Sequence, residues 1–218
     1  MEQILFAIEE DIPIILSLMN GAVRDDIQKD WYVTDDEDFV RRHIGGQEMQ
    51  EVSGGNKKSV DAEGYTLKYV IDGEMAAFLL VRHPGEAEDN LGRNLFKGSE
   101  VLRLRDSVAE DAEAKVAQVV RETGEAADFF CISHMESAAV HPDYRGRGLQ
   151  GKLLQEAERI ERQRGTRFLM ATVHPDNVYS LRNLEAAGFQ CIQETRKYGG
   201  LRRKVLCKRL DTVKQRCI

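Results

Sequence analysis

Three glycines at the start of a helix-like stretch are the feature that most constrains this chain. Residues 135–154 read MESAAVHPDYRGRGLQGKLL, so a strand-like run is followed by a turn and then by Gly146, Gly148 and Gly151. Glycine lets a backbone approach a ligand closely, and the first N–H groups of a helix lack partners and lie at the positive end of its dipole. Such a helix start is an anion site suited to a diphosphate.

Arg145, Arg147 and Lys152 add positive charge around these glycines. A glycine-rich turn that binds nothing is the alternative, but an ordinary turn does not also collect three cations. A P-loop is excluded, because it needs Ser or Thr after its lysine to hold magnesium, and here Leu153 follows Lys152.

The same glycines satisfy the G-x-G-x-x-G pattern of dinucleotide-binding units. That fold places its first glycine at a strand end, whereas residues 141–145 separate Gly146 from the preceding strand. The next strand, residues 168–173, also lacks an acidic residue at its end for the ribose hydroxyls. A nucleotide-binding oxidoreductase therefore stays only as a third alternative.

The chain alternates strand and helix patterns, which predicts one mixed central sheet flanked by helices, an α/β (α+β) fold. Asp72-Gly73 between two β-rich runs is typical of a hairpin turn. Ser107 and Glu110 form a capping box, which predicts a helix over 107–123 inserted between the third and fourth strands. The predicted strands are 4–8, 65–71, 75–81, 129–140, 168–173, 189–194 and 204–210; the other predicted helices are 12–19 after an Asp11 N-cap, one beginning at 35–38, 149–164 closed by Gly165, and 176–187 closed by Gly188.

A length of 218 residues without a repeat or a flexible linker predicts a single domain over 1–210 and a tail over 211–218. The four cysteines show no paired spacing, so we expect no metal site. No run of about 18 uncharged apolar residues exists, and the acidic start MEQILFAIEED differs from a secretory leader. We expect a cytoplasmic protein that does not enter a membrane.

Charge is distributed unevenly along the chain. Residues 141–218 hold 17 Lys and Arg against 8 Asp and Glu, although the net charge of the whole chain is −6. A basic segment on an acidic chain favours a local anionic ligand over a nucleic acid, which would usually require a basic domain. A solvated basic surface is the alternative, and we expect no nucleic-acid partner.

The glycine segment resembles the central motif of the GNAT superfamily of acyl-CoA-dependent N-acyltransferases. In that motif a strand and a turn precede Arg/Gln-x-x-Gly-x-Gly/Ala at a helix start. Arg145-x-x-Gly148 matches it, while Gln150 stands where the family usually has Gly or Ala. Residues 173–177 (VHPDN) and 187–189 (AGF) resemble the family's fifth strand and the two ends of its fourth helix.

This resemblance implies acetyl-CoA as the cosubstrate. Its pantetheine arm would pair with strand 132–140 like an added strand, at the point where that strand separates from the next one. Its diphosphate would contact N–H groups of residues 147–152. The residues expected to bind it are Ala138, Ala139, Val140, Arg145, Gly146, Arg147, Gly148, Leu149, Gln150, Gly151, Lys152, Asn177 and Ser180.

Transfer of an acyl group to an amine needs a group that takes a proton from the amine near the same strand. We expect Glu136 to do this, because strand alternation places it on the same face as Ala138. His134 lies two residues further back on that face. The alternative for Glu136 is an ordinary strand carboxylate.

Many relatives carry a tyrosine as general acid for the thiolate, but the matching position in this chain is Leu184. Some relatives carry a glutamate base near the end of the fifth strand, and this chain has Thr172 at that position. Tyr198, on the predicted loop between the last two strands, and Tyr179 are the candidates to replace the acid. A CoA thiolate is also a tolerable leaving group without one.

We therefore expect direct transfer of an acetyl group from acetyl-CoA to a primary amine of a small molecule or peptide. A cationic amine is favoured, because Asp25, Asp26 and the acidic residues 35–38 are expected to border the acceptor side. The alternative is a CoA-binding regulatory or sensor domain without transfer activity, which the missing tyrosine favours. We expect a monomer or a homodimer.

Overall fold

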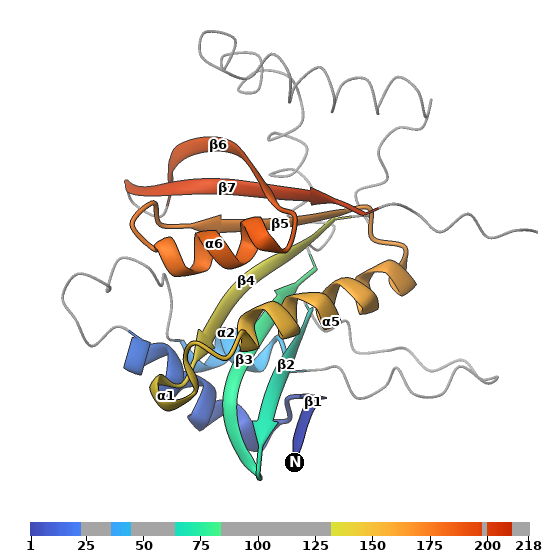
Figure 1. Ribbon diagram of the computed structural model, residues 1–218, viewed down its shortest axis with the longest axis vertical. Helices are drawn as coiled ribbons and strands as arrows, with labels where there is room; N and C mark the ends of the chain where they lie inside the picture. The colour runs from blue at the N-terminus through green and yellow to red at the C-terminus, as the bar shows by residue number, and fades with distance from the viewer. Residues whose placement is uncertain (23–35, 45–63, 84–131, 198–199, 211–218) are drawn as a thin grey trace, which may run out of the picture.

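The computed structural model describes residues 1–22, 36–44, 64–83, 132–197 and 200–210. Within these ranges, seven strands form one mixed sheet in the order β1-β2-β3-β4-β5-β7-β6 (Figure 1), which confirms the predicted fold class. In chain order the elements are β1 (Glu2–Phe6), η1 (Glu9–Asp11), α1 (Ile12–Ala22), α2 (Glu37–Arg41), β2 (Gly64–Ile71), β3 (Glu74–Arg82), β4 (Ile132–Val140), η5 (Pro142–Tyr144), α5 (Leu149–Arg164), β5 (Phe168–Val173), α6 (Val178–Ala186), β6 (Gln190–Lys197) and β7 (Leu201–Arg209).

The hairpin of β2 and β3 forms as the sequence predicts. Asp72 and Gly73 have φ of 50° and 91°, and Ile71 pairs with Glu74 across the turn. Positive φ at both central positions matches the right-handed twist of the paired strands, which is why Asp-Gly is favoured there.

β4 and β5 are the parallel pair of the sheet, and α5 is the crossover that parallel pairing requires. The two strands pair only from Ile132 to Met135 on β4 and from Phe168 to Ala171 on β5. β4 continues beyond Met135 and pairs with β3 as far as Val140. The sheet therefore opens between β4 and β5, as the sequence comparison with the GNAT pattern implied.

Helices cover both faces of the sheet. α5 lies across β2, β3 and β4 on one face (Figure 1), and the apolar side chains of α5 and α6 join one core cluster with that face. α1 and α2 pack against the opposite face in a second cluster. The first cluster includes Leu67, Leu79, Val81, Leu153, Ala157, Leu181 and Leu184, and the second includes Ile15, Met19, Val40, Phe78 and Leu80.

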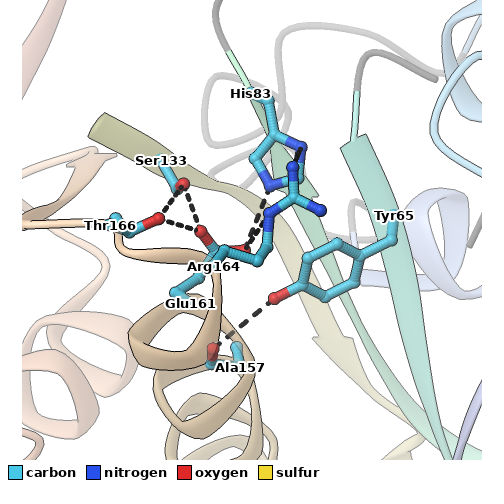
Figure 2. Close-up of polar contacts among 7 residues, drawn as sticks. All are labelled: Tyr65, His83, Ser133, Ala157, Glu161, Arg164 and Thr166. Atoms are coloured by element: carbon cyan, nitrogen blue, oxygen red, sulfur yellow. Dashed lines mark hydrogen bonds and ion pairs between the residues drawn. The ribbon is translucent and has the colours of Figure 1, made fainter. Parts of the chain in front are cut away.

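A buried carboxylate anchors α5 to the strands, as Figure 2 shows. Glu161 is fully buried and accepts hydrogen bonds from Ser133 Oγ and Thr166 Oγ1, each at 2.5 Å, and His83 Nε2 lies 3.0 Å from its other oxygen. Burial alone would raise the pKa of Glu161, but these hydrogen bonds, that of His83 foremost, lower it to about 2. The ionised carboxylate thus fixes the C-terminal half of α5 against β3 and β4.

The N-terminal helix differs from its prediction in one respect. Asp11 closes a short 3-10 turn before α1 rather than capping α1, since its carboxylate accepts the N–H of Ile8 at 2.8 Å and lies 2.5 Å from Lys68 Nζ. A second acidic residue does form the predicted kind of cap: Asp36 accepts from the N–H of Asp38 at the start of α2.

The predicted helix over 107–123 and the tail over 211–218 lie outside the described residues. Among the helices that are described, none combines the length and the apolar character needed to cross a bilayer.

Candidate functional site

The site lies where β4 and β5 separate, which we call the fork: the point just after Met135 and Ala171. Beyond the fork, β4 continues its pairing with β3 through Ala138, Ala139 and Val140, whereas its register with β5 ends at Met135. An extended ligand can use the open side of such a strand, because backbone amide and carbonyl groups alternate along it. The pantetheine contacts of these three residues stay a prediction, and the end of the β4–β5 pairing is the place where they would form.

A β-bulge places Glu136 at the fork. Leu80 pairs with Ser137 and Val81 with Met135, so Glu136 is an extra residue in β4. The bulge shifts the alternation of side chains between the two faces of the sheet. Across the bulge, two residues separated by an even number of positions no longer lie on the same face. Ala138 consequently packs with the α5 face, whereas Glu136 contacts Arg82, which lies on the α1 and α2 face. The prediction that Glu136 shares a face with Ala138 was wrong.

Gly148 is the N-cap of α5 and, like Gly146, adopts positive φ (70° and 78°), which only glycine takes without strain. The first helical hydrogen bond runs from Lys152 N to Gly148 O at 3.1 Å. No backbone bond is found in the described ranges for the N–H groups of residues 149–151, which stay available to an anion. The N–H of Lys152 makes this helical bond, and its expected contact with the diphosphate stays a prediction.

The turn around these N–H groups is open enough for a diphosphate. Apart from the adjacent residues and the backbone of α5 itself, a Cβ added to Gly146, Gly148 or Gly151 would meet no atom of the described residues within 4 Å. Arg145 and Arg147 are exposed beside it, and the Arg147 guanidinium lies 5.1 Å from the centre of the Tyr144 ring. The positive helix end and the two arginines fit a diphosphate.

The third cation of the motif is already paired. Lys152 Nζ lies 3.3 Å from Glu2 Oε2 and 3.0 Å from Tyr69 Oη, and Tyr69 donates to the same Glu2 oxygen at 2.6 Å. Hydrogen bonds with Tyr69 and Lys152 lower the pKa of Glu2. Sequence reasoning missed this partner, because no local pattern links residue 2 to residue 152.

Gln150, the departure from the family motif, joins the starts of α5 and α6. Its amide donates to Ser180 Oγ at 3.3 Å and its carbonyl accepts from Asn183 Nδ2 at 2.7 Å. Asn177 caps α6 by accepting the N–H of Ser180 at 3.1 Å. The structure therefore brings Asn177 and Ser180 to the glycine turn, and the Gln150 side chain is held toward α6.

Four polar side chains form what we call the fork cluster: Arg82, His134, Glu136 and Lys197. Arg82 Nε lies 3.2 Å from Glu136 Oε2, and both side chains are 21% exposed. Arg82 pairs in register with His134. Burial, together with the charges of Arg82 and Lys197, lowers the pKa of His134 to about 3, so its imidazole is neutral near neutral pH. Arg82 and Lys197 carried no sequence signal.

Of the two candidates for a general acid, the structure describes only Tyr179. Tyr198 lies outside the described residues. Tyr179 is 71% exposed on the first turn of α6. Leu184, at the position where many relatives have tyrosine, is buried in the α5 and α6 core.

Comparison with protein families gives one match: residues 116–189 match the model of the acetyltransferase (GNAT) family. No curated protein matches the sequence significantly. The match confirms the resemblance seen around the glycine turn, and among the described elements it covers β4, η5, α5, β5 and α6.

Solved structures share the fold at low identity. The ribosomal-protein-S18-alanine N-acetyltransferase of Escherichia coli has a TM-score of 0.56 and 16% identity, with 100% of this chain and 99% of that chain covered. A putative acetyltransferase of Salmonella typhimurium, solved with its cofactor acetyl-CoA, has a TM-score of 0.59 and 17% identity, with 100% of this chain and 99% of that chain covered. A ribosomal-protein-alanine N-acetyltransferase of Brucella melitensis has a TM-score of 0.59 and 18% identity, with 95% of this chain and 99% of that chain covered.

Proposed function

We propose that this chain, whose residues 116–189 belong to the GNAT acetyltransferase family and whose fold is that of GNAT N-acetyltransferases, transfers an acetyl group from acetyl-CoA to a primary amine. The observation that carries the proposal is the meeting of two features in one place. The fork after Met135 ends the pairing of β4 with β5, and the start of α5 offers N–H groups without a backbone partner next to Arg145 and Arg147.

Different residues of the site bind the diphosphate and the pantetheine arm of the cofactor. N–H groups of residues 149–151 with Arg145 and Arg147 bind the diphosphate, and Ala138 to Val140 pair with the amides of the pantetheine arm. Asn177 Nδ2 remains able to donate from the start of α6. Acetyl-CoA supplies a thioester carbonyl whose carbon is open to an amine.

In the transfer step, the acceptor nitrogen forms a bond to the carbonyl carbon as the C–S bond breaks, and the electron pair leaves with sulfur. The nitrogen must lose one proton. Glu136 receives it, because it is the carboxylate that the bulge brings to the fork, on the face opposite the glycine helix. A backbone N–H of β4 stabilises the charge on the carbonyl oxygen.

The second candidate is a CoA-binding regulatory domain, which the burial of Leu184 at the usual tyrosine position favours. Two measurements separate the proposals: calorimetric titration with CoA, and thiol release from acetyl-CoA across a panel of primary amines. Transfer predicts both binding and amine-dependent thiol release, whereas binding without release with every amine would establish the regulatory alternative. Binding of NADH in place of CoA would overturn both.

A further inference from the structure

Gln150, the second residue of α5, is half-buried and links this helix to α6. Its side-chain oxygen accepts from Asn183 Nδ2 at 2.7 Å, and its side-chain nitrogen donates to Ser180 Oγ at 3.3 Å. Its main-chain N–H is one of the three at the start of α5 for which the described ranges hold no backbone acceptor. One residue therefore contributes an N–H to the anion site and holds a hydroxyl of the neighbouring helix beside it.

The direction of these bonds decides what Ser180 can do. A serine hydroxyl carries one proton and two lone pairs. Because Ser180 Oγ accepts from Gln150, its own proton points elsewhere, and no acceptor for it is found among the described residues. Asn177 is arranged in the same way: its side-chain oxygen accepts the N–H of Ser180, while its amide nitrogen has no acceptor in those ranges. The first turn of α6 thus uses its side-chain acceptors internally and keeps donors for a ligand.

We propose that Gln150 is a positioning residue for the cofactor: by donating to Ser180 Oγ, it directs the proton of this hydroxyl to an oxygen of the CoA diphosphate. The inference rests on the proposed function, whose diphosphate site lies at the same helix start, and deepens it. An alanine at position 150 would keep the main-chain N–H but lose both side-chain bonds, so the Ser180 hydroxyl would be free to rotate. A bond to the diphosphate is made equally before and during transfer, so its loss affects binding and not the chemical step.

The test is a double-mutant cycle on CoA affinity. Gln150→Ala and Ser180→Ala are each expected to raise the Kd for CoA about 5- to 20-fold in calorimetric titration, the range for one hydrogen bond to a charged group. The double variant should bind CoA no more weakly than the weaker single variant, because Gln150 acts through Ser180. Dephospho-CoA, which keeps the diphosphate and lacks only the 3′-phosphate, should show the same losses.

A second substitution tests the direction of the hydrogen bond. Gln150→Glu keeps the size of the side chain and still accepts from Asn183, but it cannot donate, so Ser180 must turn its proton toward the new carboxylate. CoA affinity should therefore fall at least as far as in Gln150→Ala. Gln155, an exposed glutamine on the same helix, gives the matched controls Gln155→Ala and Gln155→Glu, which should bind CoA within about twofold of wild type.

The kinetic readout separates positioning from a general loss of structure. In Gln150→Ala, the KM for acetyl-CoA should rise by the same factor as the Kd, while kcat for amine acetylation stays within about twofold of wild type. A fall in kcat equal to the rise in KM would overturn the inference, because a loosened site would impair the transfer step as well.

The remaining outcomes distinguish this inference from the proposed function. Unchanged CoA affinity in Gln150→Ala, losses that multiply in the double variant, or losses confined to CoA and absent with dephospho-CoA would each overturn the inference and leave the transferase function in place. Failure of the wild-type protein to bind CoA would overturn both. Coupled losses shared by CoA and dephospho-CoA, with kcat retained, would support both.

Discussion

Glu161 and Ser133 share a hydrogen bond of 2.5 Å inside the protein, joining α5 to the second residue of β4. This bond lies between the two elements that carry the site: β4 opens at the fork, and α5 begins at the glycine turn. Because β4 and α5 are held at this end, their opposite ends keep a defined separation. The buried network therefore supports the site without belonging to it.

Glu161→Gln is expected to lower the free energy of unfolding by about 2 to 4 kcal/mol, because a neutral amide cannot accept all the hydrogen bonds that now surround the carboxylate. Urea denaturation measures the change. Glu156→Gln is the control on the same helix, since Glu156 pairs with Arg159 at the surface and should change the value by less than about 1 kcal/mol. Equal losses in the two variants would contradict the network's role.

The same carboxylate predicts how stability depends on pH. The pKa of Glu161 is about 2 in the folded protein and near 4.5 when unfolded. The unfolded chain therefore binds the proton first, so this contribution is complete above pH 4.5 and is lost as the pH falls toward 2. Wild-type unfolding free energy should fall more steeply over that window than that of Glu161→Gln. Parallel curves from acid titrations in urea would contradict the assignment.

Local signals explain which parts of the fold could be predicted from sequence. Asp72-Gly73 predicted the hairpin, and Gly165 predicted the end of α5, because each turn needs the positive φ that these residues adopt. The glycine turn was located for the same reason. These features depend on a few adjacent residues, so a single sequence suffices to recognise them.

Long-range register explains what could not be predicted. The face of Glu136 depends on a bulge that exists only in the pairing of β4 with β3, where Ser137 and Met135 face adjacent residues of the partner strand. Likewise, the pairing of Lys152 with Glu2 requires β1 to lie beside β2 next to α5. No pattern within either segment carries this information.

Gly148→Val tests the anion site. A β-branched residue is strained at φ of 70°, so the start of α5 should rearrange and the affinity for CoA should fall about 10- to 100-fold in calorimetry. Gly165→Val is the control, because Gly165 has φ of 84° at the other end of the same helix. It should destabilise the protein yet bind CoA normally. Unchanged binding in Gly148→Val would place the ligand elsewhere.

Glu2→Gln tests whether the ion pair with Glu2 weakens the attraction of Lys152 for the diphosphate of CoA. Removing the Glu2 carboxylate releases Lys152 and removes a negative charge beside Arg147, so CoA should bind about two- to fivefold more tightly at low salt. The gain should shrink as salt rises. Glu9→Gln is the charge-matched control, since Glu9 pairs with Arg41 instead. An equal gain in both variants would show only a general effect of net charge.

Glu136→Gln tests the proton acceptor. The amide keeps the size of the side chain and can still contact Arg82, but it cannot take a proton, so kcat for amine acetylation should fall about 100-fold or more. Calorimetry should show unchanged CoA affinity, because the diphosphate contacts lie at the start of α5. Glu194→Gln, which alters a carboxylate paired with Lys204 on β6 and β7, should retain full activity. A kcat for Glu136→Gln within about twofold of the wild-type value would show that the amine loses its proton by another route, such as water, and that Glu136 serves only to hold Arg82.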